Sequence, residues 1–192
     1  MRILILGPQG SGKGTQAKRI EAEFGLPHIA TGDILREAIA QGTELGRLAK
    51  PIYDRGDLVP DDIIVGVIRD RLSQADADDG FVLDGFPRNL AQAEALDDML
   101  LEIDRPLDVV LELRVPRDVV RERMLLRARE EGRSDDTPEA IERRLALFDE
   151  VTQPVIDHYA PSGKLVAVHG DKPIDGVWSE VQDALELARG RA

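Results

Sequence analysis

Short apolar segments alternate with amphipathic segments along the chain. Five apolar segments are rich in Val, Ile or Leu and too short for a helix, so they predict strands at 2–6, 27–30, 81–83, 109–113 and 165–168. The longer stretches between them have helical spacing. Strands separated by helices indicate an α/β fold, with a five-stranded parallel sheet flanked by helices on both faces. Such a sheet places its ligand site at the carboxyl ends of the strands.

Two segments interrupt this alternation. Residues 31–60 carry predicted helices at 33–40 and 44–54 with no strand between them. Residues 123–136 form a polar, arginine-rich connection between two helices, the second beginning with Thr137 as N-cap and Pro138 at its first position. Both segments suit mobile flaps over a site, and the alternative is an ordinary solvated surface. No linker divides the chain, so we expect one domain.

A glycine-rich loop follows the first predicted strand. The segment GPQGSGKGT at 7–15 has four glycines in its first eight positions, which lets backbone N–H groups turn inward toward an anion. Lys13 adds a full positive charge, and the predicted helix after it adds the positive end of its dipole. Strand, loop and helix in this order indicate a phosphate-binding loop for a nucleoside triphosphate. The expected contacts are Gly10, Ser11, Gly12, Lys13, Gly14 and Thr15.

The loop departs from the strict pattern at one position. That pattern has Ser or Thr directly after the lysine, whereas here Gly14 follows and the hydroxyl comes one residue later on Thr15. Direct ligation of Mg²⁺ by this hydroxyl is therefore left open.

Composition limits the possible partners. A net charge of −12 over 192 residues disfavours nucleic-acid binding, which needs surplus Lys and Arg, so any phosphate site must be a local concentration of positive charge. The chain has no cysteine and three scattered histidines, which disfavours a zinc site. No stretch is long and apolar enough for a membrane span, and Met1 runs directly into the first strand without room for a signal peptide. We expect a cytoplasmic protein that binds no membrane.

Polar residues also follow three other predicted strands, at 31–33, 84–88 and 169–172. Asp84 ends an apolar strand, where an ionised carboxylate needs a partner or a cation. A Mg²⁺ ion reached through water is one interpretation, and a helix-capping role is the other. Arg88 follows Asp-Gly and a proline, which is a poor place for a merely solubilising residue.

Six motifs together resemble those of the adenylate kinases, which are nucleoside monophosphate kinases. They are GPQGSGKGTQA (7–17), ATGDILR (30–36), GDLVPD (56–61), DGFPR (84–88), GRSDD (132–136) and ERRL (142–145). The resemblance covers essentially the whole chain, with Gln9 where the family commonly has proline. It implies a single P-loop kinase domain with a core at 1–30, 61–122 and 137–192, an NMP-binding insertion at 31–60 and a short lid without zinc at 123–136.

The resemblance implies a reversible, Mg²⁺-dependent transfer of the terminal phosphoryl group of ATP to AMP, giving two ADP. Such a reaction depends on positioning and on electrostatic stabilisation, for which the planar fork of arginine is well suited. The implied catalytic residues are Lys13, Arg88, Arg133 and Arg144. ATP would be held by the loop together with Arg123, which would stack on the base, Arg127 and Lys172. AMP would be held by Thr31, Gly32, Arg36, Asp57, Leu58, Val59, Gly85, Arg88, Gln92, Arg133 and Arg144. Arg129 and Arg143 are expected to be ordinary surface residues.

Three other functions compete with this interpretation. A kinase of UMP or CMP would share the phosphate-binding features, and we favour AMP because Thr31 and Gln92 offer a hydroxyl and an amide to adenine. A non-enzymatic P-loop module that reads guanine would carry an Asn-Lys pair, which the chain lacks. A purely structural protein would leave the loop, Asp84 and the arginines unexplained. We expect a monomer whose partners are ATP, AMP and ADP.

Overall fold

The computed structural model describes residues 1–131 and 136–190. Its strands are β1 (Arg2–Leu6), β2 (His28–Ala30), β3 (Phe81–Asp84), β4 (Val109–Arg114) and β5 (Leu165–His169). Its α-helices are α1 (Lys13–Phe24), α2 (Thr31–Gln41), α3 (Glu44–Asp54), α4 (Asp61–Leu72), α5 (Leu90–Glu102), α6 (Arg117–Glu130), α7 (Pro138–Leu147), α8 (Gln153–Tyr159) and α9 (Ile174–Arg189). Shorter helical turns lie at Ala75–Ala77 (η1), Phe148–Thr152 (η2, a π-helical turn) and Ala160–Ser162 (η3).

The strands form one parallel sheet in the order β2-β3-β1-β4-β5, which confirms the predicted fold class. The central strand β1 has β3 and then β2 on one side, and β4 and then β5 on the other. The crevice at the carboxyl end of such a central strand is where open α/β sheets bind ligands. The glycine-rich loop begins there, directly after Leu6.

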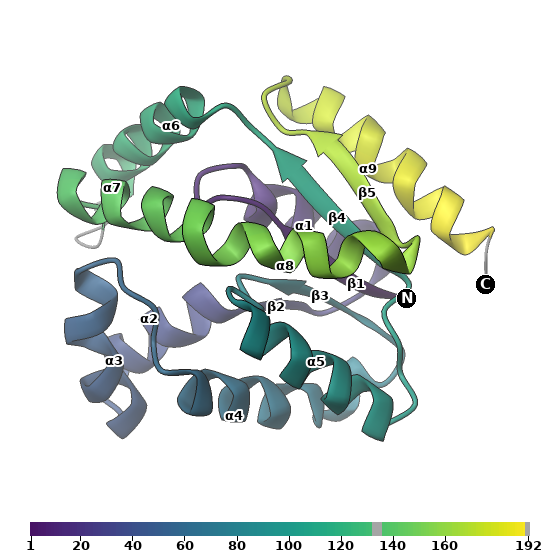
Figure 1. Cartoon of the computed structure of the whole chain (residues 1–192), viewed down its shortest axis with the longest axis horizontal. Helices are drawn as coiled ribbons and strands as arrows, with labels where there is room; N and C mark the ends of the chain where they lie inside the picture. Colours follow the sequence, from purple (N-terminus) through teal and green to yellow (C-terminus); the bar gives the residue numbers. More distant parts are fainter. Residues whose placement is uncertain (132–135, 191–192) are drawn as a thin grey trace.

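Alternating residues of β1 point into two separate cores. Leu4 and Leu6 join a cluster with residues of α4, α5 and α8, whereas Ile3 and Ile5 join a cluster with α1 and α9. Helices therefore cover both faces of the sheet, and α9 runs along β5 (Figure 1). A strand buried on both faces has no polar face to show, which explains why β1 reads as a continuous apolar run.

Both segments that interrupt the alternation contain more helix in the structure than the sequence predicted. The segment 31–60 does carry two helices, α2 and α3, and they lie at the same end of the molecule as α6 and α7 (Figure 1). The arginine-rich connection is shorter than expected, because α6 continues as far as Glu130. Thr137 caps α7 as predicted, its hydroxyl accepting from the Ala140 N–H at 3.2 Å.

Among the described residues, no helix combines the length and the apolar character needed to cross a membrane.

Helices α2 and α3 pack with almost no space between their backbones at Gly46. A Cβ atom at this position would lie 2.0 Å from the carbonyl oxygen of Ala38, so the two helices could not keep their separation. Gly46→Ala should therefore destabilise the protein by about 1–3 kcal/mol, although alanine is the better helix former. Urea unfolding of the two proteins measures this. A variant at least as stable as the wild type would show that the helices separate without cost.

Candidate functional site

Backbone groups of the glycine-rich loop form the floor of a cavity of about 620 Å³. Gly7, Gly10 and Gly12 have φ values of 142°, 84° and 98°, a range that other residues rarely adopt. Gly12 is the N-cap of α1 and provides no side-chain cap, so the N–H groups of the first helical turn keep their hydrogen-bonding capacity. The loop thus offers a ring of backbone donors and a helix dipole to an anion.

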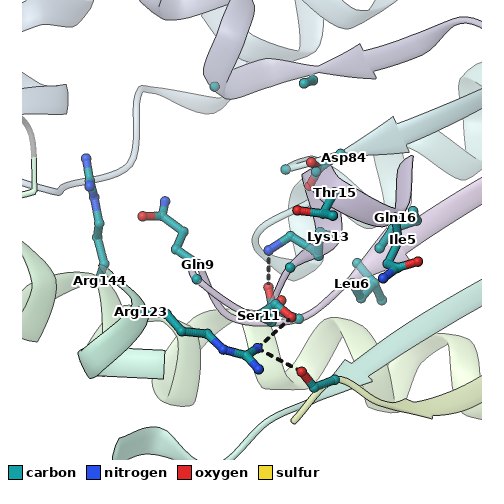
Figure 2. Close-up of a pocket in the computed structure, with 18 of the residues that line it drawn as sticks. Ile5, Leu6, Gln9, Ser11, Lys13, Thr15, Gln16, Asp84, Arg123 and Arg144 are labelled. Atoms are coloured by element: carbon teal, nitrogen blue, oxygen red, sulfur yellow. Dashed lines mark hydrogen bonds between the residues drawn. The ribbon is translucent and has the colours of Figure 1, made fainter. Parts of the chain in front are cut away.

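Lys13 turns back onto this loop, as Figure 2 shows. Its ammonium group donates to the carbonyl oxygens of Gly7 at 2.7 Å and of Pro8 at 2.8 Å. Burial lowers the pKa of Lys13 to about 8, an effect that nearby Asp84 opposes and that Arg88 and Arg127 increase. An approaching phosphate would reverse this balance, because its negative charge favours the ammonium form.

This lowered pKa predicts proton uptake when ATP binds. Close to pH 8 about half of the Lys13 amines are neutral, so binding should take up roughly half a proton, and the uptake should fall toward zero at pH 6.5. Isothermal titration in buffers of different ionisation enthalpy measures it. The same titration of Lys13→Met gives the proton uptake that does not involve Lys13. Equal uptake by both proteins would contradict the assignment of the uptake to Lys13.

Asp84 ends β3 beside a histidine that sequence reasoning did not select. Nε2 of His28 lies 3.4 Å from Oδ2 of Asp84, both side chains are largely buried, and Nε2 has no directed hydrogen bond among the described residues. Burial alone would raise the pKa of Asp84. The contact with His28 and the charges of Lys13 and Arg88 outweigh burial, so the pKa of Asp84 is lowered and the carboxylate is ionised at neutral pH.

The surroundings of Asp84 fit Mg²⁺ only when a nucleotide supplies further ligands. The described residues contain no group of three carboxylate, histidine or cysteine side chains that could hold a metal by themselves. Mg²⁺ commonly binds through one or two carboxylates, several waters and substrate phosphates. A Cβ atom placed on Gly14 would lie only 3.7 Å from Oδ2 of Asp84, so the phosphate loop passes close to this carboxylate.

Arg88 approaches the cavity from the segment after β3. Its Nε donates to the Gly85 carbonyl at 2.7 Å, while its backbone N–H donates to Oε1 of Gln92 at 2.8 Å and its carbonyl accepts from the Thr152 hydroxyl at 2.7 Å. Burial lowers the pKa of Arg88, and the neighbouring charges of Arg144 and Arg36 add to this effect. The hydrogen bonds thus hold the backbone and the Nε atom of Arg88, and the positive charges of Arg144 and Arg36 are near its guanidinium.

A buried carboxylate holds two more arginines on the α6–α7 side. Oδ1 of Asp136 accepts from Arg144 at 2.7 Å, and Oδ2 accepts from Arg127 at 2.8 Å. The side chain of Asp136 is fully buried. Arg144 also donates to the backbone carbonyl of Tyr53 at 3.2 Å, which connects α7 to α3.

Arg123 and Lys172 lie where β5 ends. Nη1 of Arg123 donates to the carbonyl oxygens of Gly170 at 2.7 Å and Ser11 at 3.4 Å, so it joins the loop after β5 to the phosphate loop (Figure 2). Lys172 is half-exposed and pairs with Glu180. Both residues line the cavity.

Most of the candidate residues line this one cavity. They are Gly10, Ser11, Gly12, Lys13, Gly14, Thr15, Gly32, Arg36, Leu58, Asp84, Gly85, Arg88, Arg123, Arg127, Arg144 and Lys172. Four others do not line it and lie in the surrounding structure: Thr31, Asp57, Val59 and Gln92. Arg133 lies outside the described residues.

Each of these four has protein partners. Thr31 is buried and donates to the Asp84 carbonyl at 3.4 Å. Gln92 is buried and its Nε2 donates to Asp61 at 2.6 Å. Asp57 accepts from Arg143 at 2.8 Å, and Val59 belongs to the core.

Three residues with contacts at the site were not among the predicted site residues, although Asp136 is the last residue of the GRSDD motif. His28 and Tyr53 line the cavity, and Asp136 holds its arginines. His28 is the first residue of β2 and does not lie at the strand's carboxyl end, so its position in the sequence gave no signal. Tyr53 lies inside a helix and gave no signal either.

The fold and the cavity define a P-loop protein in which arginines from four segments of the chain face a triphosphate-binding loop. Such an arrangement can hold two phosphate groups against each other, as phosphoryl transfer requires. This is the class of the nucleoside monophosphate kinases.

Comparison with known proteins places the chain within this class. The sequence model of the family described as "Adenylate kinase" matches residues 5–164. An adenylate kinase of Stenotrophomonas maltophilia (strain R551-3) is 48% identical over 186 residues, covering 97% of this chain and 100% of the relative. One from Xanthomonas euvesicatoria is 50% identical, covering 96% and 99%, and one from Archaeoglobus fulgidus is 43% identical, covering 97% and 98%. The chain belongs to the adenylate kinase family.

Proposed function

We propose that the chain catalyses the reversible transfer of the terminal phosphoryl group of ATP to AMP, giving two ADP. The observation that carries this is the single cavity in which the phosphate loop with Lys13 faces Arg36, Arg88 and Arg144. A module that only binds one nucleotide would need the loop but not the arginines beyond it. A charge cluster of this kind stabilises the negative charge that spreads over the transferring oxygens.

The donor side is the phosphate loop and the residues around it. Loop N–H groups and Lys13 hold the phosphates of ATP, and Arg123 and Arg127 approach from α6. Mg²⁺, when bound with ATP, neutralises phosphate charge, and Asp84 would hold it through water. No general base is required, because the acceptor phosphate is already an anion near neutral pH.

The acceptor side is formed by α2, α3 and the segment after β3. Arg36 and Arg88 hold the phosphate of AMP, while Arg133 and Arg144 complete the charge cluster from the lid side. Gly32, Gly85 and Leu58 line the cavity near them. Thr31 and Gln92 would select adenine, and since the amide of Gln92 donates to Asp61, it would exchange this partner for the base.

The insertion at 31–60 and the lid at 123–136 would close over both substrates and exclude water, which competes with AMP for the phosphoryl group. We further propose that the protein acts in the cytoplasm as a monomer, without zinc and without nucleic acid or membrane partners. The net charge of −12 disfavours nucleic-acid binding, and the absence of cysteine disfavours a zinc site.

The purified protein with ATP, AMP and Mg²⁺ should form ADP and should reach the same equilibrium when started from ADP. Hydrolysis of ATP without AMP should be far slower, because the arginine cluster acts on a second phosphate. Separating the nucleotides by ion-exchange chromatography measures both reactions. Equal ADP release with and without AMP would identify an ATPase instead.

Arg88→Ala should lower turnover by about 10²–10³ or more, since it removes a donor at developing charge, and Lys13→Met should do the same. The matched control is Arg69→Ala, because Arg69 is an exposed arginine of α4 that pairs with Glu102 outside the cavity. Its turnover should stay close to that of the wild type. Circular dichroism must show that all the variants are folded, and a folded Arg88→Ala with normal turnover would remove Arg88 from the catalytic residues.

AMP should be phosphorylated in preference to UMP and CMP offered at equal concentrations. A buried amide left unpaired by the wrong base costs about 1–3 kcal/mol, which corresponds to roughly 5–150-fold discrimination. The Gln92→Ala variant should lose most of this preference. Preferred use of a pyrimidine monophosphate by the wild type would place the protein with the UMP/CMP kinases instead.

A further inference from the structure

Tyr53 stands between the acceptor side and the α6–α7 side of the cavity. The residue is only 8% exposed, yet it lines the cavity from the C-terminal turn of α3. Its hydroxyl oxygen accepts a hydrogen bond from Nη1 of Arg36 at 2.6 Å. The guanidinium of Arg144 lies over its ring, 5.3 Å from the ring centre. One side chain thus contacts an arginine from each side of the site.

A third arginine acts on the same phenol. Burial lowers the pKa of Arg88, and Tyr53 opposes this lowering, as Asp84 does. Arg36, in turn, keeps a raised pKa despite burial, because Tyr53 and Asp33 both favour its charged form. Tyr53 therefore combines a hydrogen bond to Arg36 and a ring contact with Arg144 with an electrostatic effect on Arg88.

The hydrogen bonds of this hydroxyl are incomplete. A tyrosine hydroxyl has one proton to donate and lone pairs to accept with. In residues 1–131 and 136–190 it accepts from Arg36 and donates to no acceptor. The neighbouring guanidinium groups cannot receive its proton, since arginine offers donors only. A fitting partner is thus an anionic acceptor that the arginines also attract.

We propose that the Tyr53 hydroxyl donates a hydrogen bond to the phosphate of AMP between Arg36 and Arg88, and so selects phosphorylated acceptors. The inference rests on the proposed function, which places that phosphate at these two arginines. Tyr53 makes a phosphate contact without adding a fourth positive charge to the cluster. It is a binding residue for the acceptor, and no proton leaves it during the reaction.

Tyr53→Phe tests this with little change of shape, because it keeps the ring under Arg144 and removes only the hydroxyl. The dissociation constant of AMP should rise about 10-fold, the size expected for one hydrogen bond to a charged group. The constants for ATP and for adenosine, which lacks the phosphate, should stay within two-fold. Isothermal titration measures all three.

The matched control is the chain's other tyrosine. Tyr159 is also buried, and its hydroxyl bonds to Asp97 at 3.1 Å away from the cavity. Tyr159→Phe should leave AMP binding unchanged. A direct contact also predicts that Tyr53→Phe still weakens AMP binding when Arg36 has been changed to methionine, whereas an effect exerted only through Arg36 would disappear.

The proposal is overturned if Tyr53→Phe binds AMP within two-fold of the wild type, if it weakens adenosine as much as AMP, or if its effect vanishes beside Arg36→Met. These outcomes are separate from a failure of the proposed function. If the wild-type protein phosphorylates no AMP, the proposed function is refuted. If the wild type phosphorylates AMP and Tyr53→Phe binds AMP as tightly as the wild type, only this inference is refuted.

Discussion

Like charges held close together in a partly buried cavity are the constraint on which the site depends. Lys13 and the arginines repel one another, and the pKa of Lys13, lowered to about 8, records this repulsion together with burial. Backbone carbonyls and carboxylates keep the cluster in place: Gly7 and Pro8 accept from Lys13, and Gly85 accepts from Arg88. A phosphate that enters such a site reduces the repulsion between the positive charges. Its binding energy can then serve to position the reacting groups.

Asp136 joins two of the arginines in this arrangement. It is fully buried and accepts from Arg127 on α6 and Arg144 on α7, so one carboxylate sets the positions of two guanidinium groups. Removing one partner of a buried charge pair is costly, because the other charge stays in a poorly solvated place. The whole chain is acidic, with a net charge of −12, so the positive charge in the cavity is a local concentration on an acidic protein.

The sequence was sufficient to predict the sheet and the place of the glycine-rich loop, because both depend on local signals. β1 and the glycine loop are adjacent in the chain, and Thr137 caps the helix that it directly precedes. Tyr53 and His28 could not be found this way. Their importance comes from partners distant in the sequence, such as Arg144 and Asp84, and nothing in a helical stretch distinguishes a tyrosine that faces arginines from one that fills a core.

Gln92 also has a partner that is distant in the sequence and could not be predicted from local signals. It lies four residues after Arg88, and its Oε1 accepts from the Arg88 N–H at 2.8 Å. The spacing could not reveal that Asp61, on a different helix, accepts from its amide. A short distance in the sequence predicts that two residues are neighbours, but it does not show which acceptor a side chain takes from elsewhere in the fold.

The contacts between α3 and α7 bear on how the two sides of the site could move. Arg144 bonds to the backbone of Tyr53 and lies over its ring, and Arg143 pairs with Asp57 in an exposed position. An exposed pair contributes little, so the buried contacts of Arg144 are the ones that resist separation. Phosphate can replace them, because it offers the guanidinium oxygen acceptors of greater charge than a carbonyl. Substrate binding would then replace the contacts of Arg144 within the protein by contacts to phosphate. Arg144 would thereby couple motion of the 31–60 segment to formation of the arginine cluster.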